Sequence, residues 1–214
     1  MADSKLVTLL IVVVFFFFSG TTARAPPSGS KTISINWFIW RSCKATLYHH
    51  LCYASLISYA TDITNNPVHL ATFASNVSLK QLRLVTSRVV TIHRSFAKLR
   101  STPSFSYSYN NTYKASLLVD CMKMLHEAED LTVKSTVELK ALSTAKGMDI
   151  IWKIGNAQTW MSAAITYEDT CTDGISSVRG GFGKLGEDVI SAVNMARDFS
   201  SNALALVNSF IDDA

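Results

Sequence analysis

The sequence predicts an all-α protein: an antiparallel four-helix bundle with an N-terminal helical hairpin and two disulfides. Apolar residues recur three or four positions apart along nearly all of the chain after Pro67, which is typical of amphipathic helices. Only nine Gly and four Pro occur in 214 residues, which favours long regular elements. The four cysteines follow an apparent secretion signal and are therefore expected to form disulfides.

The N-terminus has the features of a secretory signal peptide. Residues 6–18 form an apolar run of about 13 residues, within the 7–15 range of a signal core and shorter than the roughly 20 residues of a membrane span. Small residues follow, and cleavage is expected after Ala23 or Ala25. Residues 1–25 are thus predicted to be removed, with a retained signal anchor as the alternative. Residues 33–210 suit a single domain with a sizeable core. The mature protein is expected to be secreted, without a membrane anchor.

The first element of the mature chain is expected to be a helical hairpin over 33–60. Two apolar helical pieces meet near the interval between Cys43 and Cys52. A hairpin of this size cannot bury its apolar face alone, so the face must pack on the bundle or on a second molecule. That face consists of Trp37, Phe38, Ile39, Trp40, Leu51, Tyr53, Leu56 and Ile57.

Four long helices follow the hairpin. Asn66 is expected to cap the first of them, and Pro67 occupies its first turn, where a missing N–H costs nothing. Residues 100–109, rich in Ser and Tyr, are predicted to form a loop, and so are residues 171–183, which contain four glycines. Because the connections are short, neighbouring helices should run antiparallel. The predicted helices are 67–99, 112–142, 148–170 and 185–210.

The pairing of the cysteines is open at this point, because four cysteines allow three pairings. Cys43 and Cys52 enclose a short segment, whereas Cys121 and Cys171 lie about fifty residues apart. In the loop-entropy model a bridge across the long segment stabilises by about 4 kcal/mol, and one across the short segment by less than about 3 kcal/mol.

The formal charge of +4 and the isoelectric point near 8.9 make the chain mildly basic. This balance suits an acidic polymer or a negatively charged partner. No dense block of Lys and Arg interleaved with aromatic residues occurs, so nucleic acid is not expected as a partner.

No catalytic, metal or cofactor site is predicted. His49 and His50 are adjacent and would point about 100° apart on a helix, which disfavours joint metal binding. The glycine-rich run 180–184 lacks the ending of a phosphate-binding loop. Asp120 and His126 share a predicted helix, but no serine or cysteine nucleophile is placed with them. The chain is therefore not expected to be an enzyme.

The tryptophans admit two interpretations. Tryptophans occur in carbohydrate-binding platforms, and they also occur in the packing of a core or a hairpin. Packing is the favoured interpretation for the four of them, Trp37, Trp40, Trp152 and Trp160.

Two sequons for N-glycosylation occur, at Asn76 and Asn110. Asn110 falls in the predicted loop and is the better candidate. Asn76 falls on the first long helix and must lie on its outer face to be used.

Several motifs in register with the cysteines carry a family resemblance. They are Cys43-Lys44-Ala45-Thr46-Leu47-Tyr48 with Leu51-Cys52, Leu118-Val119-Asp120-Cys121, Glu138-Leu139 with Leu142, and Thr159-Trp160-Met161-Ser162-Ala163-Ala164-Ile165-Thr166 continuing through Asp169-Thr170-Cys171-Thr172-Asp173-Gly174. Over about residues 33–210 the chain resembles the plant pectin methylesterase inhibitor and invertase inhibitor family. The resemblance implies a four-helix bundle with an N-terminal hairpin. It also implies the pairing Cys43–Cys52 and Cys121–Cys171.

Two target enzymes compete within this family. Invertase inhibitors commonly carry Pro-Lys-Phe before the third bundle helix, and residues 146–152 contain no such tripeptide. The run 160–174 is similar to the methylesterase branch instead. The resemblance therefore implies a secreted inhibitor of pectin methylesterase in the apoplast and cell wall. Inhibition of acid invertase, or a helical bundle that binds a partner without inhibiting, is the alternative.

The resemblance also implies a mechanism, in which one inhibitor covers the pectin cleft of one enzyme without covalent chemistry. Thr170 and Asp173 match residues that the family uses at this interface; their alternative role is a polar position beside a disulfide and a helix cap. The family has an acidic residue two positions after the third cysteine, where this chain has Lys123. That departure puts the corresponding contact, and with it the choice of target, in question.

Overall fold

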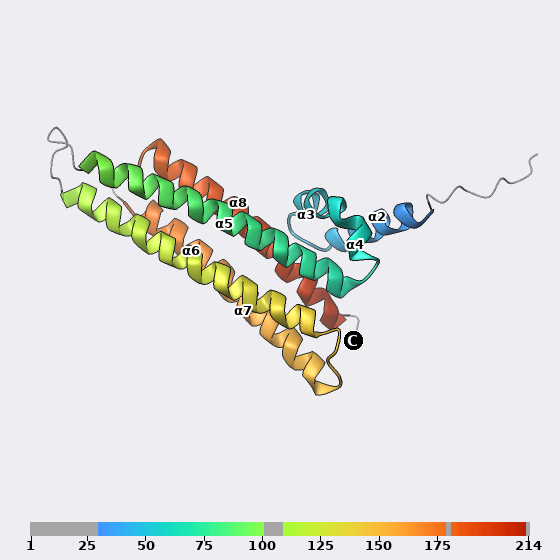
Figure 1. The fold of residues 1–214 in the computed structure, drawn as a ribbon. Helices are drawn as coiled ribbons and strands as arrows, with labels where there is room; N and C mark the ends of the chain where they lie inside the picture. Colours follow the sequence, from blue (N-terminus) through green and yellow to red (C-terminus); the bar gives the residue numbers. More distant parts are fainter. Residues whose placement is uncertain (1–29, 101–108, 179–180, 213–214) are drawn as a thin grey trace, which may run out of the picture. The chain divides into compact units, whose positions relative to one another are not determined.

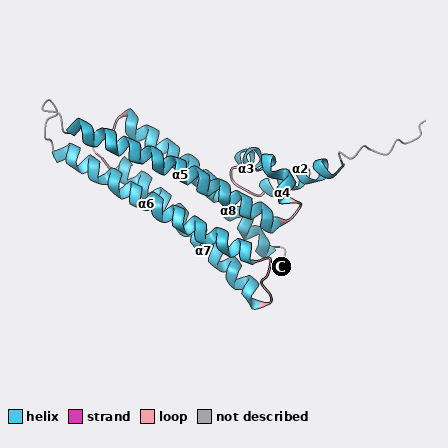
Figure 2. Cartoon of the chain, in the orientation of Figure 1, coloured by secondary structure: helices cyan, strands magenta, loops and turns pink. Residues whose placement is uncertain are grey.

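The computed structural model describes residues 30–100, 109–178 and 181–212, and every regular element among them is helical (Figures 1 and 2). The signal peptide predicted for 1–25 lies outside the described residues. The hairpin region consists of α2 (Ser30–Cys43), α3 (His49–Leu56), the 3₁₀ helix η1 (Ile57–Tyr59) and α4 (Ala60–Ile63). The bundle consists of α5 (Pro67–Arg100), α6 (Tyr109–Ala141), α7 (Met148–Ser176) and α8 (Lys184–Asp212).

The four long helices lie side by side as the sequence predicts, so the fold class is confirmed (Figure 1). The Asn66 cap is also present: its side-chain Oδ1 accepts hydrogen bonds from the backbone N–H of Val68 (2.8 Å) and of His69 (3.2 Å). Because Pro67 has no N–H and the N–H of Leu70 donates to the carbonyl of Asn66, these bonds satisfy the two N–H groups at the start of α5 that have no partner within the helix. At α7 the residue before the helix is Gly147, with φ +54°, a left-handed conformation that glycine adopts without steric cost.

The third bundle helix is longer than the sequence predicts. Helix α7 continues through Ser176, so the loop expected from Cys171 onward begins later. Cys171 and Ile175 are buried in the core, and the N–H of Ser177 donates to the carbonyl of Asp173 (3.0 Å). Burial of these side chains outweighs the roughly 1 kcal/mol that Gly174 costs inside a helix.

The hairpin packs on the bundle rather than standing alone. Ile39, Leu56 and Ile63 are fully buried in a core cluster that includes residues of α5, α6, α7 and α8. The side-chain amide of Asn202 on α8 also binds the backbone of Tyr48, accepting from its N–H (3.2 Å) and donating to its carbonyl (3.0 Å). The turn between α2 and α3 is therefore held by hydrogen bonds as well as by apolar contact.

A buried polar cluster crosses the bundle and joins three of its helices. Ser200 on α8 donates to Oε1 of Glu168 on α7 (2.7 Å) and lies 2.8 Å, hydroxyl to hydroxyl, from Ser78 on α5. Glu168 is fully buried, and its Oε2 has no hydrogen-bond partner among the described residues. Burial raises the pKa of Glu168 to about 8, against the opposing effect of the Ser200 hydrogen bond.

Candidate functional site

The disulfide between α6 and α7 fixes which face of α7 points away from the bundle. Cys121 and Cys171 are bonded and buried, with their Cα atoms 4.4 Å apart. Cys43 and Cys52 form the other disulfide, with Cα atoms 5.6 Å apart. This is the pairing that the family resemblance implies. Because Cys171 faces α6, the residues on the opposite side of α7 face solvent.

This outer face of α7 is unusual because it lacks charge over most of its length. Residues at helical spacing form a continuous stripe, and no charged side chain belongs to it until Asp173. Solvent-facing helix surfaces usually carry charged residues. The members of this α7 stripe are Met148, Trp152, Gly155, Thr159, Ser162, Thr166, Thr170, Asp173 and Ser177.

The threonines of the α7 stripe have their hydroxyl donors satisfied within the helix. Thr159 donates to the carbonyl of Gly155 (2.8 Å), Thr166 to that of Ser162 (3.1 Å), and Thr170 to that of Thr166 (2.7 Å). These hydroxyls have no donor left to be desolvated when another surface covers them. Covering the middle of the α7 stripe in an interface therefore carries only a small desolvation cost.

The first turn of α7 adds large exposed apolar side chains to this surface. Trp152 is 68% exposed, Met148 67% and Ile151 62%. The expectation that the tryptophans serve packing is wrong for Trp152, because its helical position is opposite the buried Ala157 and Met161. That spacing was visible in the sequence and is the signal that identifies Trp152 as a surface residue.

Thr170 and Asp173 lie together at the far end of the α7 stripe. They are three residues apart on one helix, which places their side chains roughly 5–6 Å apart. Both are exposed, and Asp173 forms no ion pair with any residue in the described part of the chain. The neighbouring Asp169 does: its Oδ1 is 2.9 Å from Nη1 of Arg197 on α8, and this hydrogen bond raises the pKa of Arg197.

Lys123 lies on a different helix from these two residues. It is exposed on α6, with its Nζ 3.5 Å from Oδ1 of Asp120 one turn earlier. The outer face of α6 carries charges of both signs, in contrast to that of α7. These charged residues are Asp120, Lys123, Glu127, Asp130 and Lys134.

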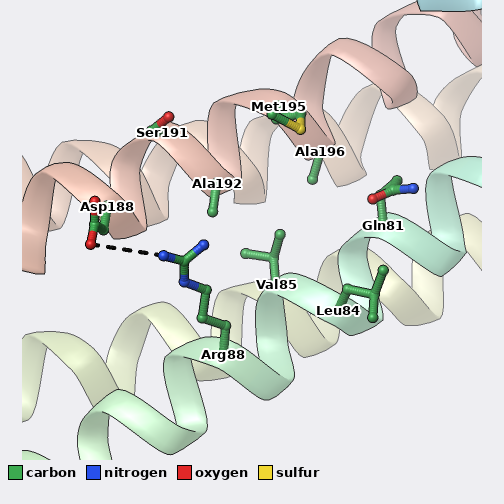
Figure 3. Close-up of a pocket in the computed structure, with 9 residues that line it drawn as sticks. All are labelled: Gln81, Leu84, Val85, Arg88, Asp188, Ser191, Ala192, Met195 and Ala196. Carbon is green, nitrogen blue, oxygen red and sulfur yellow. Dashed lines mark ion pairs between the residues drawn. The ribbon is translucent and has the colours of Figure 1, made fainter.

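A shallow groove lies between α5 and α8, and Figure 3 shows the residues that line it. Its volume is about 270 Å³, Val85 and Ala192 lie at its floor, and Arg88 reaches across to Asp188 (3.8 Å). Leu84 is exposed at its rim. Its lining contains one serine, Ser191, and neither a histidine nor a cysteine.

The described residues contain no group of three His, Cys, Asp or Glu side chains placed to hold a metal ion. His49 and His50 are exposed, and their ring centroids lie 4.3 Å apart. Within the same described ranges, no helix combines the length and apolar character needed to cross a bilayer.

Of the two glycosylation candidates, Asn76 lies where the sequence predicts and Asn110 does not. Asn76 is exposed on α5, as its use requires. Asn110 lies in the first turn of α6 rather than in the loop before it. Glycan attachment at either site stays a prediction.

Comparisons with known proteins agree on one family. Residues 38–206 match the family model described as plant invertase/pectin methylesterase inhibitor. Pectinesterase inhibitor 9 of Arabidopsis thaliana is 37% identical over 194 residues, which is 89% of this chain and 87% of that protein. Pectinesterase inhibitor 11 of Arabidopsis thaliana (81% of this chain, 80% of that protein) and a 21 kDa protein of Daucus carota (82% and 84%) are each 37% identical over 175 residues.

A solved structure shares the fold. The crystal structure of a mutant form of a pectin methylesterase inhibitor from Arabidopsis aligns with a TM-score of 0.55. The alignment covers 78% of this chain and 92% of that one at 14% identity, so it bears on the fold alone.

Proposed function

The chain belongs to the plant invertase/pectin methylesterase inhibitor family, and we propose that it inhibits a plant pectin methylesterase by covering its pectin cleft as a 1:1 complex. Family membership assigns it an inhibitor role rather than an enzymatic one. The observation that carries the proposal is the outer face of α7. That face is long, uncharged until Asp173, and has Trp152 exposed at its start.

The dimensions of the α7 stripe suit a cleft that binds a polymer. Helix α7 has 29 residues, which gives a length of about 43 Å at a rise of 1.5 Å per residue. Stable interfaces bury about 800 Å² on each partner, and a helix of this length with its flanking residues can supply that area. The bundle holds the helix in place, so little conformational entropy is lost when it binds.

The chemistry of the stripe also fits a protein interface. A large aromatic side chain that becomes buried is the usual kind of binding hot spot, and Trp152 is such a side chain. The threonines beyond it have no unsatisfied hydroxyl donors, so they can be covered at low cost. Asp173 supplies a carboxylate without an internal partner, and with Thr170 it gives the far end of the stripe a polar contact for the enzyme.

A methylesterase is the preferred target over an acid invertase. Two relatives at 37% identity are named pectinesterase inhibitors. Residues 146–152, which comprise the two residues before α7 and the start of that helix, contain no Pro-Lys-Phe tripeptide and place exposed apolar side chains there instead. Lys123 stands where the family pattern has an acidic residue, and the variant Lys123→Glu tests its contribution to target choice.

The proposed site of action is the extracellular space of the plant, in the apoplast and cell wall. Residues 1–25 have the pattern of a cleaved secretory signal. Two disulfides are usual in secreted proteins and rare in the cytosol. The sequons at Asn76 and Asn110 are consistent with passage through the secretory pathway.

Titration of a plant pectin methylesterase with the secreted protein tests this function, with acid invertase titrated in parallel. We expect loss of methylesterase activity at near-equimolar inhibitor and no effect on invertase. Inhibition of invertase alone would reassign the target. A lack of effect on both enzymes from about pH 5 to about pH 8 would contradict the proposal and leave a helical bundle that binds a partner without inhibiting.

A further inference from the structure

The exposed face of α2 carries aromatic and cationic side chains that the inhibitory site does not use. Trp37 is 54% exposed and Trp40 44%, so the expectation that they serve packing is wrong for these two as well. Arg41 and Lys44 are exposed beside them; Lys44 directly follows the last residue of α2, and its N–H still donates to the carbonyl of Trp40 (3.1 Å). The four positions are therefore spaced so that they lie on one side of the helix and its end. We call these four residues the α2 stripe.

The two cations of the α2 stripe lie against the tryptophan rings. The guanidinium carbon of Arg41 is 5.3 Å from the centroid of Trp37, and Nζ of Lys44 is 4.1 Å from that of Trp40. Both are cation–π distances. Neither cation pairs with a carboxylate in the part of the chain that the structure describes.

The surrounding sequence leaves this positive charge uncompensated. No Asp or Glu occurs between Asp3 and Asp62, so α2, α3 and η1 lack acidic side chains, and Asp62 in α4 is the one acidic residue of the hairpin region. With Arg41 and Lys44 the hairpin region has a net positive charge, whereas most of the acidic residues of the chain lie in the bundle. This surface therefore favours a negatively charged ligand.

The α2 stripe is held in position before any ligand binds. The disulfide Cys43–Cys52 closes the turn after α2, and the hydroxyl of Thr46 donates to the carbonyl of Cys43 (2.8 Å) inside that turn. Tyr48, at the end of the turn, is bound to Asn202 of α8. A rigid surface loses little conformational entropy on binding.

We propose that the α2 stripe binds an acidic sugar polymer, a linear polyuronate, at a site separate from the α7 stripe. The C–H face of a pyranose ring packs on an indole face, and its carboxylate is bound by the guanidinium or ammonium group beside that indole. Each Trp–cation pair thus offers both contacts that one uronate residue needs. The pairs follow each other along α2, as sugar units follow each other along a polymer.

An anionic membrane is the less suitable occupant. A helix that lies in a bilayer interface presents a broad apolar face to the acyl chains and keeps its cations at the edges. In α2 the apolar Ile39 is instead buried in the core that the hairpin shares with the bundle, and Phe38 packs against that core. The two exposed indoles are interleaved with cations rather than segregated from them.

The proposed site distinguishes two forms of one polymer by charge. Hydrolysis of a methyl ester converts a neutral uronate ester into a carboxylate, which Arg41 and Lys44 can bind. We therefore expect the protein to bind polygalacturonate and not its fully methyl-esterified form. Because the contacts are exposed charges, binding should weaken as salt is added.

The test is retention of the secreted protein on immobilised polygalacturonate, at low and high salt, beside the same polymer fully methyl-esterified. Trp37→Ala/Trp40→Ala and Arg41→Gln/Lys44→Gln should each weaken binding at low salt by about tenfold or more. The matched controls are Trp152→Ala, which removes an exposed tryptophan from α7, and Lys80→Gln/Arg94→Gln, which removes two exposed cations from α5. Both controls should bind as the parent does.

Three results would overturn the proposal. They are equal binding of the parent to both polymers or to neither, unchanged binding of both α2 variants, and binding to phosphatidylserine vesicles without binding to polygalacturonate. Inhibition of methylesterase by the α2 variants gives an independent readout. It should be unchanged, because these residues lie outside the α7 stripe; a loss would mean that the two surfaces are not separate.

Discussion

The α2 stripe and the α7 stripe are both exposed, both carry tryptophan, and both end beside a disulfide, yet their charges differ. In α2 each exposed indole has a cation on its ring, and no acidic residue occurs in α2 or α3. In α7 the exposed Trp152 is followed by threonines whose hydroxyls donate within the helix. The first surface suits a charged ligand attracted over a distance, and the second suits close contact with a folded protein.

The largest expected effect concerns the buried face of α7, which contains a carboxyl group, whereas α2 has none. Glu168 has a pKa of about 8 in the folded protein and 4.5 in the reference state, so the folded state holds its proton more tightly. Stability should therefore fall as pH rises from about 4.5 to about 8 and then level off. At 1.36 kcal/mol per pKa unit, the loss is at most about 5 kcal/mol.

Denaturant unfolding of the parent and of Glu168→Gln from about pH 5 to about pH 8 checks this expectation. The variant should lose most of the pH dependence, because its amide does not ionise. The charged groups that act on Glu168 are Asp169, Asp198 and Arg197, and they remain in both proteins. Glu187→Gln, an exposed change on α8, is the control. An equally steep loss of stability in Glu168→Gln would show that another group is responsible.

The two disulfides should differ in their contribution to the free energy of unfolding. Cys121–Cys171 closes a segment of 50 residues and Cys43–Cys52 one of 9. In the loop-entropy model, replacing the first pair by alanine costs about 4 kcal/mol, and replacing the second costs less than about 3 kcal/mol. Urea unfolding of the two double variants measures both values. The reverse order would mean that the hairpin contributes more to the fold than its loop length suggests.

Trp152→Ala should weaken methylesterase binding by about 2 kcal/mol, or about 30-fold in Kd, because the indole is expected to be buried only in the complex. Trp40→Ala, at a comparable exposed indole on α2, should leave Kd unchanged. Inhibition titrations of both variants give the two constants. Equal losses of affinity in both variants would contradict the functional difference between the α2 stripe and the α7 stripe.

Asp173→Asn should weaken methylesterase binding by about tenfold, because it removes a carboxylate that lacks an ion-pair partner within the described residues. The change preserves shape and removes only charge. Dissociation rates measured by surface plasmon resonance give the effect. An unchanged dissociation rate would show that Asp173 is a polar residue near a disulfide and not a contact with the enzyme.

Lys123→Glu should have the smallest effect, a change of less than about threefold in Kd. The side chain is exposed and its charge is screened by solvent. Tighter binding to methylesterase is the expected direction, because the change restores the acidic residue of the family pattern. The same titration detects it, and a shift of inhibition from methylesterase to invertase would instead show that Lys123 sets the target.

Periodicity and family motifs predicted the bundle and its helix order because apolar spacing reports directly which residues are buried. They did not predict that α7 continues past Cys171, because burial of Ile175 outweighs the local preference of Gly174. They also assigned Trp37, Trp40 and Trp152 to packing. A tryptophan suits both a core and a binding surface, and only its angular position relative to buried neighbours separates the two. The Glu168–Ser200 bond joins two helices and has no signal in local sequence.

In the proposed complex the outer face of α7 covers the target enzyme while that of α2 stays free, and the exposed tryptophans of the two faces allow a direct measurement. Oxidative footprinting by mass spectrometry compares their reactivity in the secreted protein alone and in an equimolar mixture with pectin methylesterase. We expect Trp152 to become protected in the mixture, while Trp37 and Trp40 react as they do in the free protein. Protection of Trp37 and Trp40 with Trp152 still reactive would contradict this assignment of the interface to α7.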